Sequence, residues 1–319
     1  MPGFGAGRLT GQILVMAAVV VSAAAAAGAQ AAKGAKQAPG TFVLGDTQQV
    51  SAASVLGAFP GPKIGGPLPN PPAAQIPAII HAFTSNEKLF RELLQNDYIY
   101  EESIKMQEYD PSGSPGGIYQ QTNSITYTPQ GIRQILCTFC PQPTLQYVQV
   151  TEDDLTDMFN MNYYTLSLDE LPEYNVTYME HVPLDQVNTY VFSIAPKTIV
   201  KGHRYFQGKV YVDDQKLMIV FSDGRVVPNQ YDKHGNPTNT FLPFKVWRQE
   251  VDGKYYFPVY TLMQGVIPGG PGTAATPMKM VIQFTNYKRF RATTRILAVT
   301  TLPGETKPAT PPALPKIPH

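Results

Sequence analysis

A two-residue alternation of apolar and polar side chains is the feature that most limits how this chain can fold. After Gln95 the spacing of apolar residues changes from three or four to two, and Ile104 and Met106 alternate with Ser103 and Lys105. Successive side chains of a β-strand point to opposite faces of a sheet, so this spacing predicts strands with one apolar face. The strands predicted on this basis are 98–107, 118–127, 133–137, 145–150, 175–180, 189–194, 205–213, 217–222, 245–251, 255–263 and 279–286.

Turn and helix signals complete the predicted fold class. Asp252-Gly253 between two strand patterns predicts a short hairpin. A helix is expected over 79–94, where apolar residues recur at three- and four-residue steps, and a short helix over 151–159, where a threonine precedes three acidic residues. About eleven strands and two or three helices, without strand–helix alternation, predict an antiparallel α+β domain.

The N-terminal 31 residues read as a secretory signal peptide. The apolar run Ile13–Val21 is followed by small residues, and both 27–29 and 29–31 fit a small-x-small cleavage site. The alternative is an uncleaved membrane anchor, but this apolar stretch is shorter than the roughly 20 residues that a spanning helix needs. We therefore predict export to the periplasm and a mature chain without a transmembrane span.

Two proline-rich stretches flank the expected domain. Residues 32–77 hold eight of the 30 prolines and are predicted to be a linker, and 303–319 hold six more and are predicted to be a tail. Such segments are usually solvated, although they can also bind a partner protein. The predicted folded domain is therefore 78–302.

The two cysteines, Cys137 and Cys140, form a C-x-x-C pair. In an exported protein a structural disulfide is the favoured reading. Free thiols and a redox-active pair remain alternatives, although Pro143 disfavours the helix start that a thioredoxin-like site needs.

Charge and motifs argue against several functions. With 25 Lys+Arg against 24 Asp+Glu, the chain lacks the basic excess that nucleic-acid binding requires. The five histidines are widely spread, and the sequence contains no H-E-x-x-H, G-x-S-x-G or P-loop pattern. We therefore expect no catalytic residues, no metal site and no cofactor.

Several motifs in the C-terminal half resemble a known family. They are Lys201-Gly202-His203-Arg204-Tyr205-Phe206-Gln207-Gly208-Lys209-Val210-Tyr211-Val212-Asp213, Phe241-Leu242-Pro243-Phe244, Asp252-Gly253-Lys254-Tyr255-Tyr256-Phe257-Pro258-Val259-Tyr260 and Thr285-Asn286-Tyr287-Lys288-Arg289-Phe290. Together they resemble the outer-membrane lipoprotein-sorting proteins of the LolA/LolB-like superfamily, in an acidobacterial-type branch. The resemblance covers roughly 78–292, and Tyr211 and Tyr256 stand where the family pattern has Trp.

The resemblance implies an incomplete antiparallel β-barrel whose concave face is covered by helices. In the carrier members of this superfamily, that face holds the acyl chains of a lipoprotein. The implied ligands here are therefore lipid or lipoprotein acyl chains, and the implied partners are other proteins of the cell envelope.

The alternating strands supply candidates for an apolar cavity. A sheet with one large apolar face must cover it with helices, a second sheet or a ligand. The residues predicted to line such a cavity are Phe192, Phe206, Val210, Phe221, Trp247, Phe257, Tyr260, Met280, Ile282 and Phe284.

Two functions are compatible with this reading. The first is a periplasmic carrier or chaperone that binds acyl chains for outer-membrane sorting. The second is a non-enzymatic envelope scaffold, in which the same residues fill an ordinary core and the proline-rich tails bind proteins.

Overall fold

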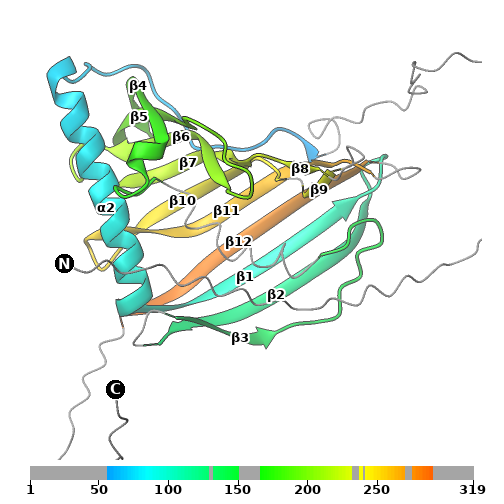
Figure 1. Cartoon of the computed structure of the whole chain (residues 1–319). Helices are drawn as coiled ribbons and strands as arrows, with labels where there is room; N and C mark the ends of the chain where they lie inside the picture. The colour runs from blue at the N-terminus through cyan, green and yellow to red at the C-terminus, as the bar shows by residue number, and fades with distance from the viewer. Residues whose placement is uncertain are drawn as a thin grey trace, which may run out of the picture. The chain divides into compact units, whose positions relative to one another are not determined.

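Within the described residues, ten antiparallel strands form one sheet and one long helix packs against it (Figure 1). The computed structural model describes residues 56–128, 132–150, 166–231, 237–239, 241–269 and 275–289, which all belong to the compact unit Gln49–His319. The predicted signal peptide, the start of the predicted linker and the predicted C-terminal tail lie outside these residues.

The strand order makes the sheet open. Its strands are β1 (Tyr98–Tyr109), β2 (Pro115–Tyr127), β3 (Arg133–Phe139), β4 (Tyr174–Leu184), β5 (Val187–Pro196), β6 (Tyr205–Asp213), β7 (Ile219–Val227), β10 (Phe244–Val251), β11 (Tyr255–Ile267) and β12 (Thr276–Arg289). They follow the order β3-β2-β1-β12-β11-β10-β7-β6-β5-β4, so that β3 and β4 are the two edges. The short strands β8 (Gln230–Tyr231) and β9 (Pro237–Asn239) pair separately. This arrangement confirms the predicted α+β class and incomplete antiparallel barrel.

The helix α2 (Ile76–Asp97) confirms the helix predicted over 79–94 and extends it at both ends. Pro77 lies in its first turn, where a missing backbone N–H costs nothing. Two short 3₁₀ helices, η1 (Ala73–Gln75) and η3 (Leu171–Glu173), are also present. The helix predicted over 151–159 lies outside the described residues. Among the described residues, α2 is the long helix that covers the sheet.

Ten of the eleven predicted strands are present, and the prediction for 145–150 is wrong. This segment is not a strand, because its backbone donors bond to a side chain instead of a neighbouring strand. The buried Glu108 carboxylate accepts bonds from the backbone nitrogens of Gln146 (2.6 Å), Tyr147 (3.0 Å) and Val148 (3.3 Å), and from that of Gly117 (3.0 Å).

The hairpin predicted at Asp252-Gly253 is confirmed. Both residues have positive φ angles, 54° and 67°, as a type I′ turn between β10 and β11 requires. The Tyr98 hydroxyl donates a hydrogen bond of 2.6 Å to Asp252, which ties this turn to the first residue of β1.

The apolar side of α2 packs on one face of the sheet. Ile79, Phe83, Phe90 and Leu94 are all at most 7% exposed. Phe83 contacts Phe192 of β5 with a ring separation of 5.1 Å, and Phe90 contacts Phe257 of β11 at 5.4 Å. Burying four such side chains contributes roughly 6–12 kcal/mol to helix docking.

A buried ion pair lies within this apolar contact. Arg248 of β10 donates two hydrogen bonds, of 2.7 and 3.0 Å, to the two carboxylate oxygens of Glu87, and both side chains are at most 2% exposed. The guanidinium also lies 4.8 Å from the centre of the Phe90 ring. A fork-to-fork pair has a demanding geometry, so it fixes how α2 is rotated and placed over β10.

The described part of the predicted linker is in contact with the domain. Ile64 forms an antiparallel bridge with Leu184, and the backbone nitrogens of Gly65 and Leu68 donate to carbonyls of β4 at 2.8 and 2.7 Å. Earlier in the same segment, the Phe59 carbonyl accepts a 3.1 Å hydrogen bond from the Lys245 side chain of β10. The chain before α2 therefore covers the β4 edge over 64–68.

Replacing Arg248 by Met is expected to lower the free energy of unfolding by about 3–5 kcal/mol, because the Glu87 carboxylate would remain buried without the opposite charge of Arg248. The double variant Glu87→Leu, Arg248→Met is expected to be more stable than Arg248→Met alone, since no buried charge is left. Urea unfolding followed by circular dichroism measures both differences. A double variant that is no more stable than the single one would contradict this role for the pair.

Candidate functional site

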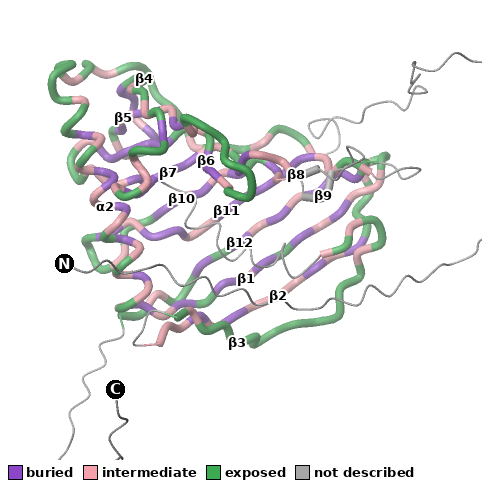
Figure 2. The backbone as a smooth tube through the Cα atoms, viewed as in Figure 1, coloured by how far each residue is buried: buried purple, intermediate pink, exposed green. Residues whose placement is uncertain are grey.

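The face of the sheet on which α2 packs, here called the inner face, carries two rows of cross-strand neighbours. Row 1 consists of Tyr119, Met106, Met280, Met263, Phe244, Gly224, Gly208, Ile194 and Val176. Row 2 consists of Gln121, Ile104, Ile282, Thr261, Val246, Ser222, Val210, Phe192 and Tyr178. Each row crosses nine strands, so the inner face carries a continuous and largely apolar set of side chains. Figure 2 shows that the central strands contain many buried residues.

Row 1 differs in character along its length. Met106, Met280 and Met263 are adjacent in register, and flexible thioethers adapt to ligands of irregular shape. Gly224 and Gly208 follow, and a Cβ atom built on Gly224 would lie 2.6 Å from the Phe206 ring. The absence of a side chain at Gly224 is therefore what lets Phe206 lie flat over the sheet and reach Phe244, at a ring separation of 5.9 Å.

Seven of the ten predicted cavity residues lie together in one buried cluster that includes the inner face. They are Phe192, Phe206, Val210, Phe257, Met280, Ile282 and Phe284, all at most 4% exposed. α2 reaches this cluster through Phe83 and Phe90. Their assignment to a lipid cavity, as opposed to a filled core, stays a prediction.

The other three predicted residues lie on the opposite, outer face. Phe221 pairs with Trp247, and Trp247 pairs with Tyr260, with ring separations of 5.1 and 5.4 Å. Phe221 belongs to a second buried cluster that also contains Tyr211. The prediction that these three rings share a lining with the other seven is therefore corrected. Alternation orders side chains within a strand but leaves the phase between strands open, and a β-bulge at Trp247/Arg248 shifts it further.

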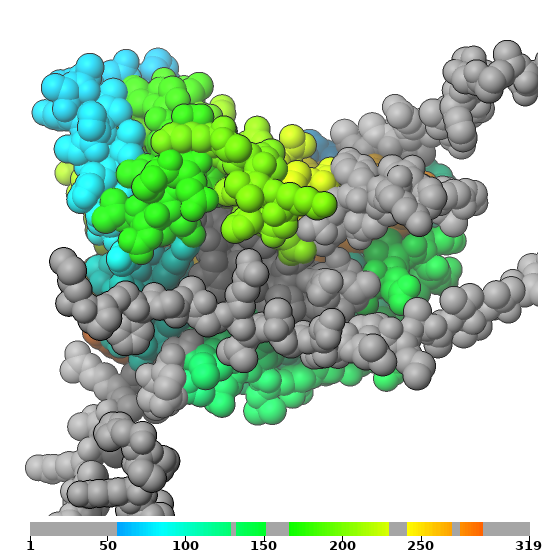
Figure 3. Space-filling view, viewed as in Figure 1, coloured from blue at the N-terminus to red at the C-terminus, as the bar shows by residue number. Residues whose placement is uncertain are grey.

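A pocket opens at each end of row 1. At the β4 end, a pocket of about 470 Å³ is lined by Ile80, Leu168, Leu171, Pro172, Tyr174, Val176 and Lys197. Figure 3 shows α2 and the β4–β5 region side by side around this part of the surface. Burial raises the pKa of Tyr174 to about 12, so its hydroxyl stays neutral and accepts a 3.1 Å bond from the Phe206 backbone nitrogen.

At the β2 end, a pocket of about 520 Å³ is lined by Tyr119 and by residues 143 and 145–150. Glu108 holds this loop in place through its bonds to backbone nitrogens. A third, more polar pocket of about 350 Å³ lies beside it, around the turn between β1 and β2. None of the ten predicted residues lines these three pockets, because each pocket combines loop residues with strand or turn residues that are distant in the sequence.

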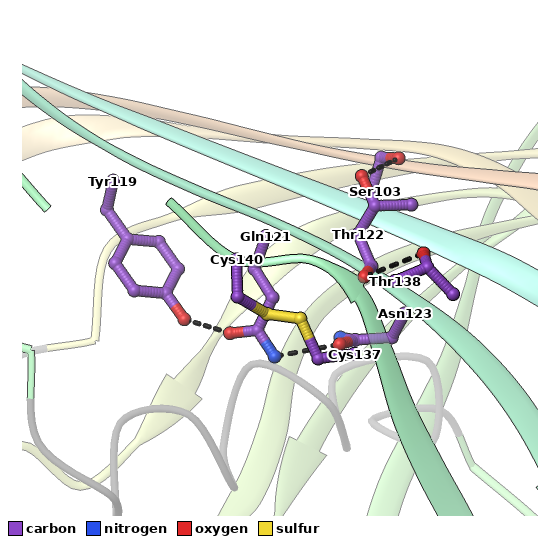
Figure 4. Close-up of a disulfide and its surroundings, with 8 residues drawn as sticks. All are labelled: Ser103, Tyr119, Gln121, Thr122, Asn123, Cys137, Thr138 and Cys140. Atoms are coloured by element: carbon purple, nitrogen blue, oxygen red, sulfur yellow. Dashed lines mark hydrogen bonds between the residues drawn. A yellow bond between two sulfur atoms is a disulfide. The ribbon is translucent and has the colours of Figure 1, made fainter. Parts of the chain in front are cut away.

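A polar strip borders the apolar rows on β2. The Tyr119 hydroxyl donates to the Gln121 side chain, and the Gln121 amide donates to Asn123 at 2.7 Å (Figure 4). Asn123 is in register with Glu102 of β1, whose carboxylate accepts a 3.0 Å bond from Arg133. These side chains were not predicted as a site, since each one alone is an ordinary polar residue of a strand.

Two side chains of this strip, Glu102 and Asn123, are fully buried, and they share a hydrogen bond across β1 and β2. Burial raises the pKa of Glu102 to about 7, and the neighbouring Arg133 acts in the opposite direction.

Cys137 and Cys140 are joined by a disulfide at the end of β3 (Figure 4). Cys137 is in register with Asn123, so the disulfide lies at the end of the strand that pairs with the polar strip. β3 itself is an exposed edge, with Leu136 67% and Phe139 56% exposed.

The described part of the chain holds no cluster of three or more His, Cys, Asp or Glu side chains that could bind a metal ion. In the same residues, no helix combines the length and the apolar character that crossing a membrane would require.

No protein-family model matches the chain, and no curated protein sequence matches it. Among solved structures, a DUF1329 family protein from Desulfovibrio piger is 11% identical, with a TM-score of 0.34 over 65% of this chain and 91% of that one. A putative outer membrane lipoprotein-sorting protein domain from Vibrio parahaemolyticus is 10% identical, with a TM-score of 0.29 over 64% and 90%. The MucA/MucB complex of Pseudomonas aeruginosa gives 7% identity and a TM-score of 0.22 over 63% and 94%. At these values none of the matches establishes a family, and the acidobacterial-type branch is not identified.

The raised pKa of Glu102 makes a prediction about pH. Between pH 4.5 and 7 the unfolded chain ionises Glu102 while the folded chain keeps the proton, so stability from this group falls as pH rises. A shift of this size corresponds to about 3 kcal/mol. Urea unfolding of the wild type and Glu102→Gln at pH 4.5 and 7.5 measures this effect. The free energy of unfolding of the wild type is expected to fall between the two pH values, and that of the variant is expected to fall less. Equal pH dependence of the two proteins would contradict it.

Proposed function

We propose that this protein is an exported carrier or chaperone that binds the acyl chains of a lipid or lipoprotein on the inner face of its sheet. The observation that supports this best is the geometry of row 1, a mostly apolar track across nine strands with a pocket at each end. Each of the two pockets includes an end residue of row 1, Val176 or Tyr119, and a chain-shaped ligand needs an entry next to an apolar wall.

The energetics of such binding rest on apolar contact alone. Each methylene that leaves water contributes about 0.8 kcal/mol, so an acyl chain needs no charged anchor. The flexible Met106, Met280 and Met263 can make room beside the sheet at a smaller cost than rigid rings. Export by the predicted signal peptide would place this activity in the periplasm, on a path toward outer-membrane sorting.

The scaffold function keeps one observation in its favour. All seven inner-face residues from the predicted set are at most 4% exposed, as in an ordinary core. The two functions differ in whether lipid accompanies the native protein.

Phe206→Asp is expected to abolish lipid uptake, because a carboxylate in the middle of the inner face would have to be desolvated against acyl chains. The matched control is Gln207→Asp, which adds the same charge to the adjacent, exposed position on the same strand. Mass spectrometry of organic extracts from protein purified out of native envelopes measures the bound lipid.

A second variant covers the case in which Phe206→Asp fails to fold. Met280→Gln keeps the length of the side chain and is expected to reduce the bound lipid while leaving the circular dichroism spectrum unchanged. Repeated absence of lipid from the wild type, or full uptake by a folded Phe206→Asp protein, would overturn the proposal.

A further inference from the structure

We infer that the β3 edge of the sheet is an interface that pairs with the β3 edge of a second copy of this chain. Two copies would then join edge to edge, with their β3 strands antiparallel. This interface does not depend on the proposed function, because it lies at the border of the sheet and not on its inner face.

The two edges of the sheet differ in what covers them. At the β4 edge, the chain's own segment 64–68 forms the Ile64 bridge to Leu184 and two backbone hydrogen bonds. At the other edge, β3 pairs with β2 alone among the described residues, and Figure 1 shows it as the outermost strand. An edge strand offers backbone donors and acceptors to a further strand, so this edge is a template for strand addition.

The side chains along this edge are apolar and exposed. Ile132, Ile135, Leu136 and Phe139 are all at least 42% exposed, and they are four of the ten strongly exposed large apolar residues in the described chain. Positions 134–139 hold no charged residue and no proline, which are the residues that commonly keep edge strands apart. Apolar side chains that gather on an open edge indicate an interaction surface.

The chemistry of β3 fits a second β3 strand. Residues 133–137 keep a regular register with β2, over a length that is typical of strands. A two-fold axis near Ile135 would bring the Ile135 side chains of the two copies together, and it would use the same surface on both, as a symmetric dimer requires. Arg133, the one charged residue in this stretch, is paired with Glu102 at 3.0 Å, so the two strands would meet without like-charge repulsion.

Net charge and exposed area also fit a dimer. The chain has a formal net charge of only +1, so two copies repel each other little. Four half-exposed apolar residues offer roughly 400–500 Å² on each copy, which with the strand backbone approaches the total of about 1,000 Å² that a specific interface needs. A lipid surface fits this edge less well, because hydrocarbon cannot satisfy the open backbone groups of a strand.

Sedimentation velocity of the full mature chain, from about 1 to 100 μM, tests this interface. We expect the wild type to be a dimer at the upper concentration. Leu136→Lys is expected to raise the dimer dissociation constant at least ~10-fold, because two lysines would lie close to the two-fold axis. Ile199→Lys is the matched control and is expected to dimerise like the wild type, since Ile199 is also an exposed apolar residue but lies between β5 and β6.

Hydrogen–deuterium exchange at both ends of this concentration range locates the contact. Peptides of β3 are expected to exchange more slowly in the dimer, and peptides of β4 are expected to be unchanged. Ile135→Lys replaces Leu136→Lys if the latter does not fold.

Three results would each overturn the interface. The first is a wild type that stays monomeric, as expected if β3 pairs with a strand of a different protein. The second is a folded Leu136→Lys protein that dimerises as the wild type does. The third is a dimer in which β3 exchanges as fast as in the monomer.

Discussion

The buried pair of Glu87 and Arg248 is the interaction on which the arrangement of this fold most depends. In the described residues a single helix covers the inner face, so the position of that helix decides which part of the apolar surface is closed and which borders a pocket. The rings of Phe83 and Phe90 pack the helix onto the sheet, and the two-bond fork adds a directional contact inside this apolar interface.

Everything else about the candidate site follows from the way the sheet continues beyond this contact. The rows on the inner face run from β2 to β4 without interruption by a charged side chain, and they end at loops that leave pockets at Tyr119 and Val176. At the β2 end, the Glu108 carboxylate replaces a neighbouring strand as the acceptor for backbone donors of the loop, and Thr144 bonds the same loop to Ile118 of β2. An apolar track of this kind is the surface that an acyl chain needs, and the proposed function rests on it.

The sequence predicted local structure well and the site only in part, for identifiable reasons. A two-residue period located ten strands, and the Asp252-Gly253 pair located the turn between two of them. Both signals depend only on residues that are neighbours in the sequence. It could not place Phe221, Trp247 and Tyr260 on the outer face, since that depends on the register between strands and on a bulge. The Glu87–Arg248 pair joins residues 161 positions apart, and the polar strip combines residues of two strands, β1 and β2. No local pattern carries such information, and the same is true of the chain at 64–68 that covers the β4 edge.

The most direct measurement of the central claim is photo-crosslinking with a fatty acid that carries a diazirine in its chain, followed by peptide mapping of the labelled, folded protein. An acyl chain on the inner face should label peptides of β1, β11 and β12 at positions in rows 1 and 2, with Met106, Met263 and Met280 among them. Labelling restricted to the outer face around Trp247, or labelling that excess unlabelled fatty acid does not reduce, would contradict the claim that the inner face holds the ligand.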